Sequence, residues 1–155
     1  MNFRTGNSLS GWFVFFVALT TYYLTVEPTA SYWDCSEYIA TSAKLQVGHP
    51  PGAPLFQMIG AVFSSFASSP ESVAFWVNMM SVLASAFTIL FLFWSTTRVI
   101  TRFVIKDENP TGPTAFLVLG AGVVGSLSYT FSDSFWFNAV EAEVYAMAML
   151  ITSAM

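Results

Sequence analysis

The chain has 155 residues, of which 55% are hydrophobic, 17% aromatic and only 9% charged. Soluble domains carry about 25% charged residues, so this composition indicates a protein embedded in a membrane. Nine acidic and five basic residues give a formal net charge of -4, which excludes the basic surface that a nucleic-acid partner would require.

The first predicted membrane span covers residues 9–26, an apolar run of the length that a crossing helix needs. A cleaved signal peptide is the alternative interpretation, because Arg4 precedes the run. Cleavage after Ala30 would place Pro28 where a small residue is required, so we expect a retained helix.

Residues 53–67 form an ambiguous apolar segment, short for a span and long enough for a helix lying on the membrane surface. If this segment lies flat, Arg4, Arg98, Arg102 and Lys106 share one side, as the positive-inside rule favours. We therefore expect residues 27–71 to be one external loop with two interfacial helices, near 34–47 and 53–67. Residues 72–97 are the second predicted span, and residues 98–113 a cytoplasmic loop.

The third predicted span, residues 114–131, contains Gly120, Gly122 and Gly125, small residues that would let a neighbouring helix approach closely. A short external loop at 132–138 and the start of a fourth span at 139–155 follow. Because the sequence stops within that apolar run, we expect it to be a fragment of a longer membrane protein, a single all-α domain of bundled helices.

Four ionisable residues lie close together in the predicted external loop: Asp34, Glu37, Lys44 and His49. A helix over 34–47 would place the first three and Thr41 on one side, with Cys35, Ile39 and Ala43 opposite. It would end at Gly48, which would serve as a C-terminal cap. The alternative is structural, because Asp34 and Glu37 have the spacing of a capping box. A histidine beside two prolines, such as His49, is more often a residue that hydrogen-bonds its loop than a proton shuttle.

A second polar cluster follows the third predicted span and is expected on the same membrane side. Within a helix continuing from 139, Asn138, Glu141 and Tyr145 would share one face, while Glu143 would point nearly opposite. A carboxylate at membrane depth is costly unless it has a function. The alternative is that these acids only favour the positive end of the helix dipole.

Two stretches, "YWDCSEYIATSAKLQVGHPPGAPLF" and "SFWFNAVEAEVYAM", resemble a bacterial membrane family catalogued as domain of unknown function 2723. That family is similar to protein O-mannosyltransferases. The resemblance implies a polytopic glycosyltransferase with the GT-C fold, whose long first external loop carries an essential acid. It also implies a multi-pass protein of the bacterial inner membrane with its active side facing the periplasm.

The resemblance further implies transfer of a sugar from a polyprenyl-phosphate donor to a hydroxyl acceptor on a protein or glycan, next to membrane lipid. Asp34 corresponds to the first-loop acid that would accept the hydroxyl proton, and Glu37 is a second catalytic candidate. Lys44 and His49 are candidates for binding the leaving phosphate. The remaining substrate-binding candidates are Asn138, Glu141, Glu143 and Tyr145.

No cofactor is certain, although relatives of this kind place acids such as Glu141 and Glu143 where a divalent metal or the acceptor is held. Two other functions stay open from the sequence. A transporter or flippase of lipid-linked material would use the acids as ion or proton sites, usually near the bilayer midplane. The second open function is that of a non-catalytic membrane subunit that takes part in assembly.

Overall fold

The computed structural model describes residues 2–31, 33–50 and 52–155, which form helices and turns without any strand. The elements in chain order are α1 (Phe3–Thr25), α2 (Cys35–Lys44), α3 (Pro54–Ser64), η1 (Pro70–Ser72), α4 (Val73–Val99), η2 (Ile100–Ile105), α5 (Gly112–Thr130), α6 (Asp133–Ala139) and α7 (Val144–Ala154). The predicted all-helical fold class is confirmed.

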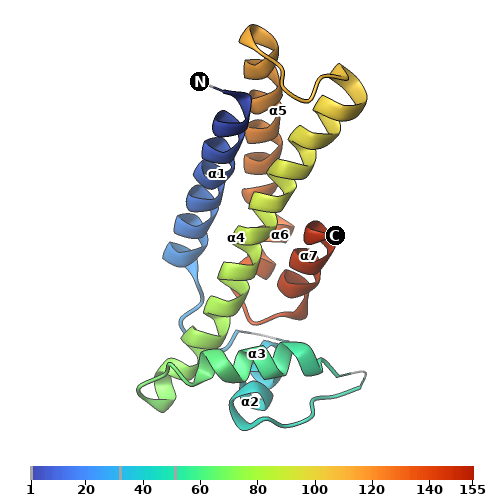
Figure 1. The fold of residues 1–155 in the computed structure, drawn as a ribbon. Coiled ribbons are helices and arrows are strands. Elements are labelled where there is room, and N and C mark those ends of the chain that lie inside the picture. Colours follow the sequence, from blue (N-terminus) through green and yellow to red (C-terminus); the bar gives the residue numbers. More distant parts are fainter. Residues whose placement is uncertain (1, 32, 51) are drawn as a thin grey trace.

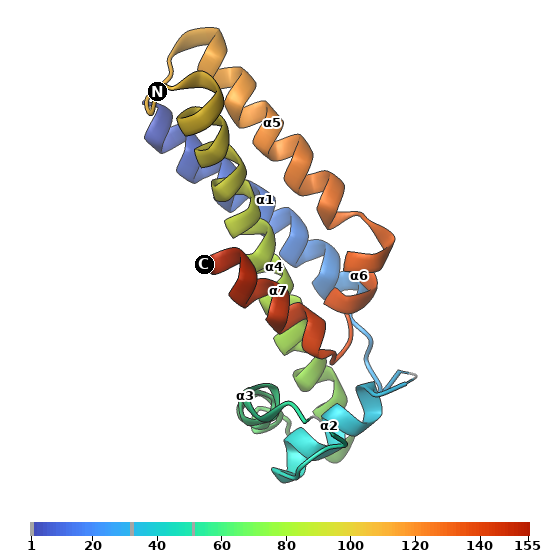
Figure 2. The same ribbon diagram turned by 90° about the vertical axis from the view of Figure 1, so that its right-hand side faces the viewer.

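Three of these helices are long and apolar enough to cross a membrane: α1, α4 together with its extensions, and α5. At 1.5 Å per residue, α1, α4 without its extensions, and α5 are about 35, 40 and 28 Å long, against a hydrocarbon thickness of about 30 Å. Figure 1 shows them side by side, with the N-terminus of α1 at the same end as the turn between α4 and α5. The short helices α2 and α3 lie across the opposite end of this bundle (Figures 1 and 2).

Helix α4 is the centre of the bundle and packs against α1, α3, α5 and α7. Its buried Val82, Ile89 and Phe93 join apolar side chains of α1 and α6 in one core. Gly122 of α5 permits close contact, since a Cβ there would lie 2.8 Å from both Phe93 and Thr97. A Cβ at Gly120 or Gly125 would meet nothing within 4 Å, so only one of the three glycines has the predicted packing role.

Helix α2 is shorter than the predicted 34–47 helix and has a different C-terminal capping motif from the predicted one. Leu45 adopts the left-handed conformation with φ 49°, its N–H bonds Ser42 O, and the Gln46 N–H bonds Thr41 O at 2.9 Å. These paired bonds form a Schellman motif, which closes the helix before Gly48. The prediction that Gly48 caps the helix is therefore wrong.

The buried face of α2 also differs from the predicted one. Thr41, expected on the polar side, is buried with its hydroxyl bonded to Glu37 O at 2.8 Å, whereas Ala43 is exposed. Ser42 is fully buried against Gly60 of α3, where a Cβ would lie 2.5 Å from the serine hydroxyl. The two short helices therefore pack closely through a glycine.

The segment after α5 departs most from expectation. Residues predicted as a loop form α6, and the chain then leaves the helical path before α7 begins at Val144. The carbonyl of Val140 accepts a hydrogen bond from Glu27 N at 3.1 Å, and Glu143 is extended at φ -124° and ψ 146°. Because this break separates them, Asn138, Glu141 and Tyr145 do not share a helical face, and that prediction is wrong.

Candidate functional site

A buried amide on α4 holds the start of the first loop in place. Asn78 is fully buried, and its Nδ2 donates to Glu27 O at 2.7 Å and Thr29 O at 3.1 Å. Its Oδ1 accepts from the Cys35 thiol at 3.9 Å, at the beginning of α2. Sequence reasoning missed Asn78, although an isolated amide within the apolar run 72–97 is a signal that polar backbone lies beside it.

Apolar packing brings α2 next to the break between α6 and α7. Cys35 and Ile39 of α2 belong to the same buried cluster as Phe56 of α3, Val77 of α4 and Ala142 of the break. Burial of these side chains provides the non-directional attraction that fixes the layer. Two segments about a hundred residues apart in the sequence thus meet at one end of the bundle.

The side chain of Glu37 fastens the loop after α2. Its Oε1 accepts from the backbone N–H of His49 at 2.6 Å, and its Oε2 lies 2.9 Å from the ring Nδ1. The hydrogen bonds from His49 lower the pKa of Glu37 below 4.5, and the carboxylate of Glu37 in turn raises the pKa of His49 above 6.5. Both shifts favour the charged pair at mildly acidic pH.

Asp34 lies next to this pair. Its side chain is exposed, and its Oδ2 lies 3.9 Å from Nε2 of His49. It occupies the N-cap position of α2 but accepts no capping hydrogen bond, and Glu37 bonds His49 instead, so the two acids do not form a capping box. We call Asp34, Glu37 and His49 the carboxylate–histidine cluster.

This cluster has the donor set of a divalent metal site. One ligand atom from each of its three residues lies within 4.8 Å of the other two. Carboxylate oxygens and imidazole nitrogen suit ions such as Mn²⁺ or Zn²⁺. In the structure Glu37 and His49 satisfy each other, so the cluster is stable as a hydrogen-bonded pair without an ion.

Two further side chains adjoin the cluster. The pKa of Glu143 is raised above its usual value, chiefly by burial and further by the charges of Asp34 and Glu141. Burial also raises the pKa of Tyr38, with Glu143 and Asp34 adding to the effect. The ring of Tyr38 lies 6.3 Å from that of His49, centroid to centroid. Sequence reasoning missed Tyr38, which the α2 register places one residue after Glu37.

The structure does not bring the other predicted residues to the cluster. Lys44 is exposed at the far end of α2, about 15 Å along the helix from Asp34. Glu141 is only 8% exposed, within the break. Asn138 and Tyr145 line a cavity of about 180 Å³ between α6 and α7, and Tyr145 is near enough to Tyr38 to add to the rise of its pKa.

Trp33 is a third residue that the sequence did not single out. It precedes Asp34, is 88% exposed and has a φ of 63°, which bulky side chains rarely adopt. An exposed indole at the end of a membrane bundle is suited to the headgroup region or to stacking on a sugar ring. A tryptophan directly before the first-loop acid was the available signal.

Comparison with known proteins bears on this geometry. A family model described as "Protein O-mannosyl-transferase TMEM260 N-terminal domain" matches residues 34–155. The chain belongs to this family. The match begins at Asp34, so it includes the whole carboxylate–histidine cluster and the break that carries Glu143.

Two relatives of the TMEM260 N-terminal domain are named as enzymes. A Dictyostelium discoideum protein named "Protein O-mannosyl-transferase tmem260" is 27% identical over 134 residues, covering 85% of the chain and 14% of that protein. Mouse "Protein O-mannosyl-transferase TMEM260" is 28% identical over 134 residues, covering 86% of the chain and 17% of that protein. The chain thus spans less than a fifth of the length of either relative. No solved structure matches it significantly.

Proposed function

We propose that the chain forms the catalytic-base corner of a GT-C type membrane glycosyltransferase that mannosylates protein hydroxyls. The donor is a sugar linked to polyprenyl phosphate, and the acceptor is a serine or threonine. One observation carries the proposal: the TMEM260 N-terminal domain family presents here an exposed carboxylate, Asp34, beside a histidine at the end of three span-length helices.

Asp34 is the proposed general base. Its Oδ accepts the proton of the acceptor hydroxyl while that oxygen attacks the anomeric carbon of the sugar. The bond from this carbon to the carrier phosphate breaks with its electron pair going to the phosphate, and the sugar configuration inverts. A positioned base of this kind contributes a factor of about 10²–10⁴ to the rate.

Glu37 is a positioning residue in this scheme. By accepting from both the backbone and the ring of His49, it turns Nε2 toward Asp34. A protonated His49 donates from Nε2 toward Asp34 and orients that carboxylate for the acceptor hydroxyl, on the face of the sugar opposite the leaving phosphate. The raised pKa of His49 supports this protonation state.

The other candidates take peripheral roles. Glu143, next to the cluster, is proposed to bind acceptor hydroxyls, and the more buried Glu141 to support the break. Lys44 is proposed to meet the carrier farther along α2. Asn138 and Tyr145, in the cavity between α6 and α7, are proposed to contact the lipid part of the donor.

The test is sugar transfer from radiolabelled polyprenyl-phosphate mannose by the full-length protein in membranes. Asp34→Asn should lower the rate by about 10²-fold or more at equal protein level. Asp107→Asn, which removes an exposed carboxylate at the other end of the bundle, is the matched control and should retain activity. Unchanged transfer by Asp34→Asn would refute the assignment of the base.

The proposal also requires the cluster to face the external side of the membrane. Val47→Cys introduces a thiol at a position 90% exposed, whereas the native Cys35 is fully buried, and labelling of the unsubstituted protein gives the background from native cysteines. A membrane-impermeant maleimide should modify this cysteine in intact cells or sealed vesicles of the corresponding orientation. Labelling only after permeabilisation would contradict the proposed orientation.

A further inference from the structure

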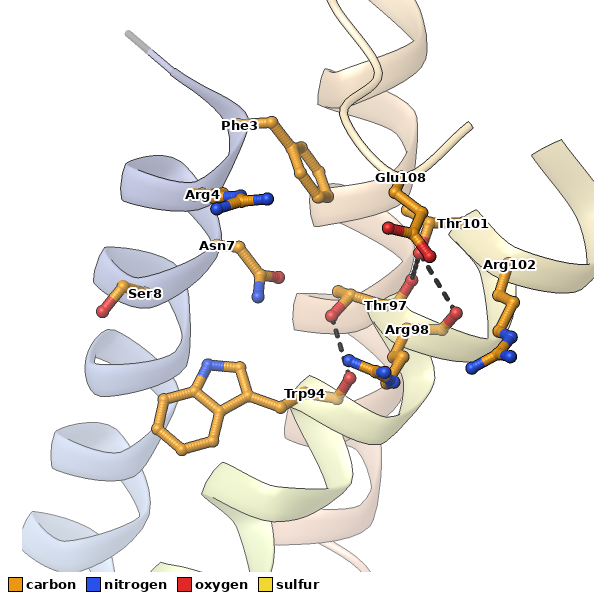
Figure 3. A pocket seen from close by; sticks show the side chains of 10 residues that line it. All are labelled: Phe3, Arg4, Asn7, Ser8, Trp94, Thr97, Arg98, Thr101, Arg102 and Glu108. Carbon is orange, nitrogen blue, oxygen red and sulfur yellow. Dashed lines mark hydrogen bonds between the residues drawn. The ribbon is translucent and has the colours of Figure 1, made fainter. Parts of the chain in front are cut away.

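A second polar site lies at the end of the bundle opposite the carboxylate–histidine cluster. A cavity of about 460 Å³ opens between the start of α1, the end of α4 with η2, and the turn that follows. Three arginines reach it, Arg4 from α1, Arg98 from α4 and Arg102 from η2, as Figure 3 shows. We call this cavity the basic pocket.

The arginines of the basic pocket are almost unsatisfied within the protein. Across residues 2–31, 33–50 and 52–155, the only side-chain hydrogen bond from their guanidinium groups joins Arg4 Nε to Asn109 Oδ1 at 3.3 Å. Glu108, the one acid in the lining, forms no ion pair within 4.0 Å with any described arginine. The lining therefore carries a formal charge of +2, which a bound anion would offset.

The pocket offers more than charge. Asn7 faces it, and its Oδ1 is buried without a hydrogen-bond partner. A buried acceptor of this kind calls for a donor that the protein itself does not supply. Phe3 and Trp94 form apolar parts of the same lining (Figure 3). A ligand that fits has an anionic group, a hydroxyl and an apolar part.

From these features we propose that the basic pocket binds the phosphate of an anionic glycerolipid headgroup. Guanidinium groups bind phosphate oxygens through paired, charge-assisted hydrogen bonds. The pocket lies at the ends of span-length helices, at the depth where lipid headgroups are found. A headgroup hydroxyl, such as the glycerol of phosphatidylglycerol, donates to Asn7 Oδ1, and the glycerol backbone rests on Phe3 and Trp94.

The test uses full-length protein in nanodiscs of phosphatidylcholine with increasing phosphatidylglycerol, without any sugar-transfer assay. The readouts are the phosphatidylglycerol retained in native mass spectrometry and the shift of the unfolding midpoint. The pair Arg98→Gln with Arg102→Gln should weaken binding by about tenfold or more, since it removes two charge-assisted contacts. Replacing both with lysine should restore part of the affinity, because the charge returns without the planar fork.

A gain of binding separates the proposal from simple misfolding. Glu108→Gln removes the acid of the lining and should tighten phosphatidylglycerol binding several-fold. Asp107→Asn and Lys106→Gln change exposed charges on the same turn that do not line the pocket, and should leave binding unchanged. Equal effects of pocket and control variants would overturn the site in favour of general surface charge.

Inorganic phosphate distinguishes the source of the phosphate group. If it raises the unfolding midpoint as much as phosphatidylglycerol does, and the arginine pair abolishes both effects, the site is real but serves a soluble phosphate. If neither probe binds the wild-type protein, the proposal is wrong. All these outcomes are independent of whether Asp34 acts as a base.

Discussion

Replacing Gly60 with alanine should loosen the layer that carries the carboxylate–histidine cluster. The new Cβ would lie 2.5 Å from Ser42 Oγ and 2.8 Å from Ser42 Cβ, distances that real Cβ atoms do not adopt. Ser42 is fully buried and its Cβ is fixed to the backbone, so α2 and α3 must move apart. Overpacking of this kind costs about 1–3 kcal/mol, of which up to about 1 kcal/mol is offset by the better helix propensity of alanine.

A second substitution turns this expectation into a measurement of the contact. Ser42→Gly removes both atoms that the new Cβ would meet, as well as a hydroxyl that is buried without a partner. Alone it should cost about 0.5 kcal/mol of helix propensity. Combined with Gly60→Ala it should recover most of the overpacking cost, which appears in the cycle as a coupling energy of about 1–2 kcal/mol.

The assay is equilibrium unfolding in detergent micelles for the wild type, both single variants and the double variant. Gly120→Ala is the control, because a Cβ there meets nothing within 4 Å. Additive effects of the two substitutions, or equal stability of Gly60→Ala and Gly120→Ala, would refute the close approach of α2 and α3.

Three further predictions follow from contacts described above. Gly122→Ala should destabilise the bundle by about 1–2 kcal/mol in micelle unfolding, whereas Gly125→Ala should not, because only the first would overpack a neighbour. Asn78→Ala should lower the free energy of unfolding by about 2–3 kcal/mol, since it leaves two backbone carbonyls without their donor. The control Thr152→Ala, which removes an exposed hydroxyl bonded within its own helix, should have a negligible effect. In NMR titration, the single histidine should titrate above pH 6.5, and Glu37→Gln should lower its pKa toward 6.5.

The last prediction also sets a pH range for the order of the loop after α2. The lowered pKa of Glu37 adds stability above pH 4.5, which is lost as the pH falls through the folded-state value. The raised pKa of His49 adds stability below pH 6.5, which is lost as the pH rises through its folded-state value. The protection factor of the His49 amide, which is the intrinsic exchange rate at each pH divided by the observed rate, should therefore be highest between about pH 4.5 and 6.5. A protection factor that does not vary with pH would contradict the pairing.

The sequence was sufficient for the parts of the fold that depend on length and apolarity. The three span-length helices, the two short helices between the first two spans, and the likeness to O-mannosyltransferases all followed from it. It also singled out Asp34, Glu37 and His49. The hydrogen bonds between Glu37 and His49 depend on the loop after α2 folding back onto that helix, and hydrophobic periodicity does not predict the path of a loop.

Long-range hydrogen bonds explain what the sequence did not reveal. The apolar run from 139 onward favours one continuous helix, but a bond from Glu27 to the Val140 carbonyl takes that acceptor from it. After this break, Glu143 lies near enough to Asp34 for that carboxylate to raise the pKa of Glu143, a proximity that the helical-face prediction did not indicate. Likewise, the burial of Thr41 follows from Gln57 of α3, whose Nε2 donates to the Thr41 hydroxyl at 3.2 Å.

The bond between Glu27 and Val140 implies an order of assembly during synthesis. The first loop is translated early and can be held by Asn78 once α4 has emerged, but its second anchor must wait for Val140. At about 5–20 residues per second, that wait lasts several seconds. During this interval the first loop has the hydrogen bonds from Asn78 but lacks the one to Val140. In a nascent chain on a ribosome stalled before Val140, protease should therefore cut the first loop readily.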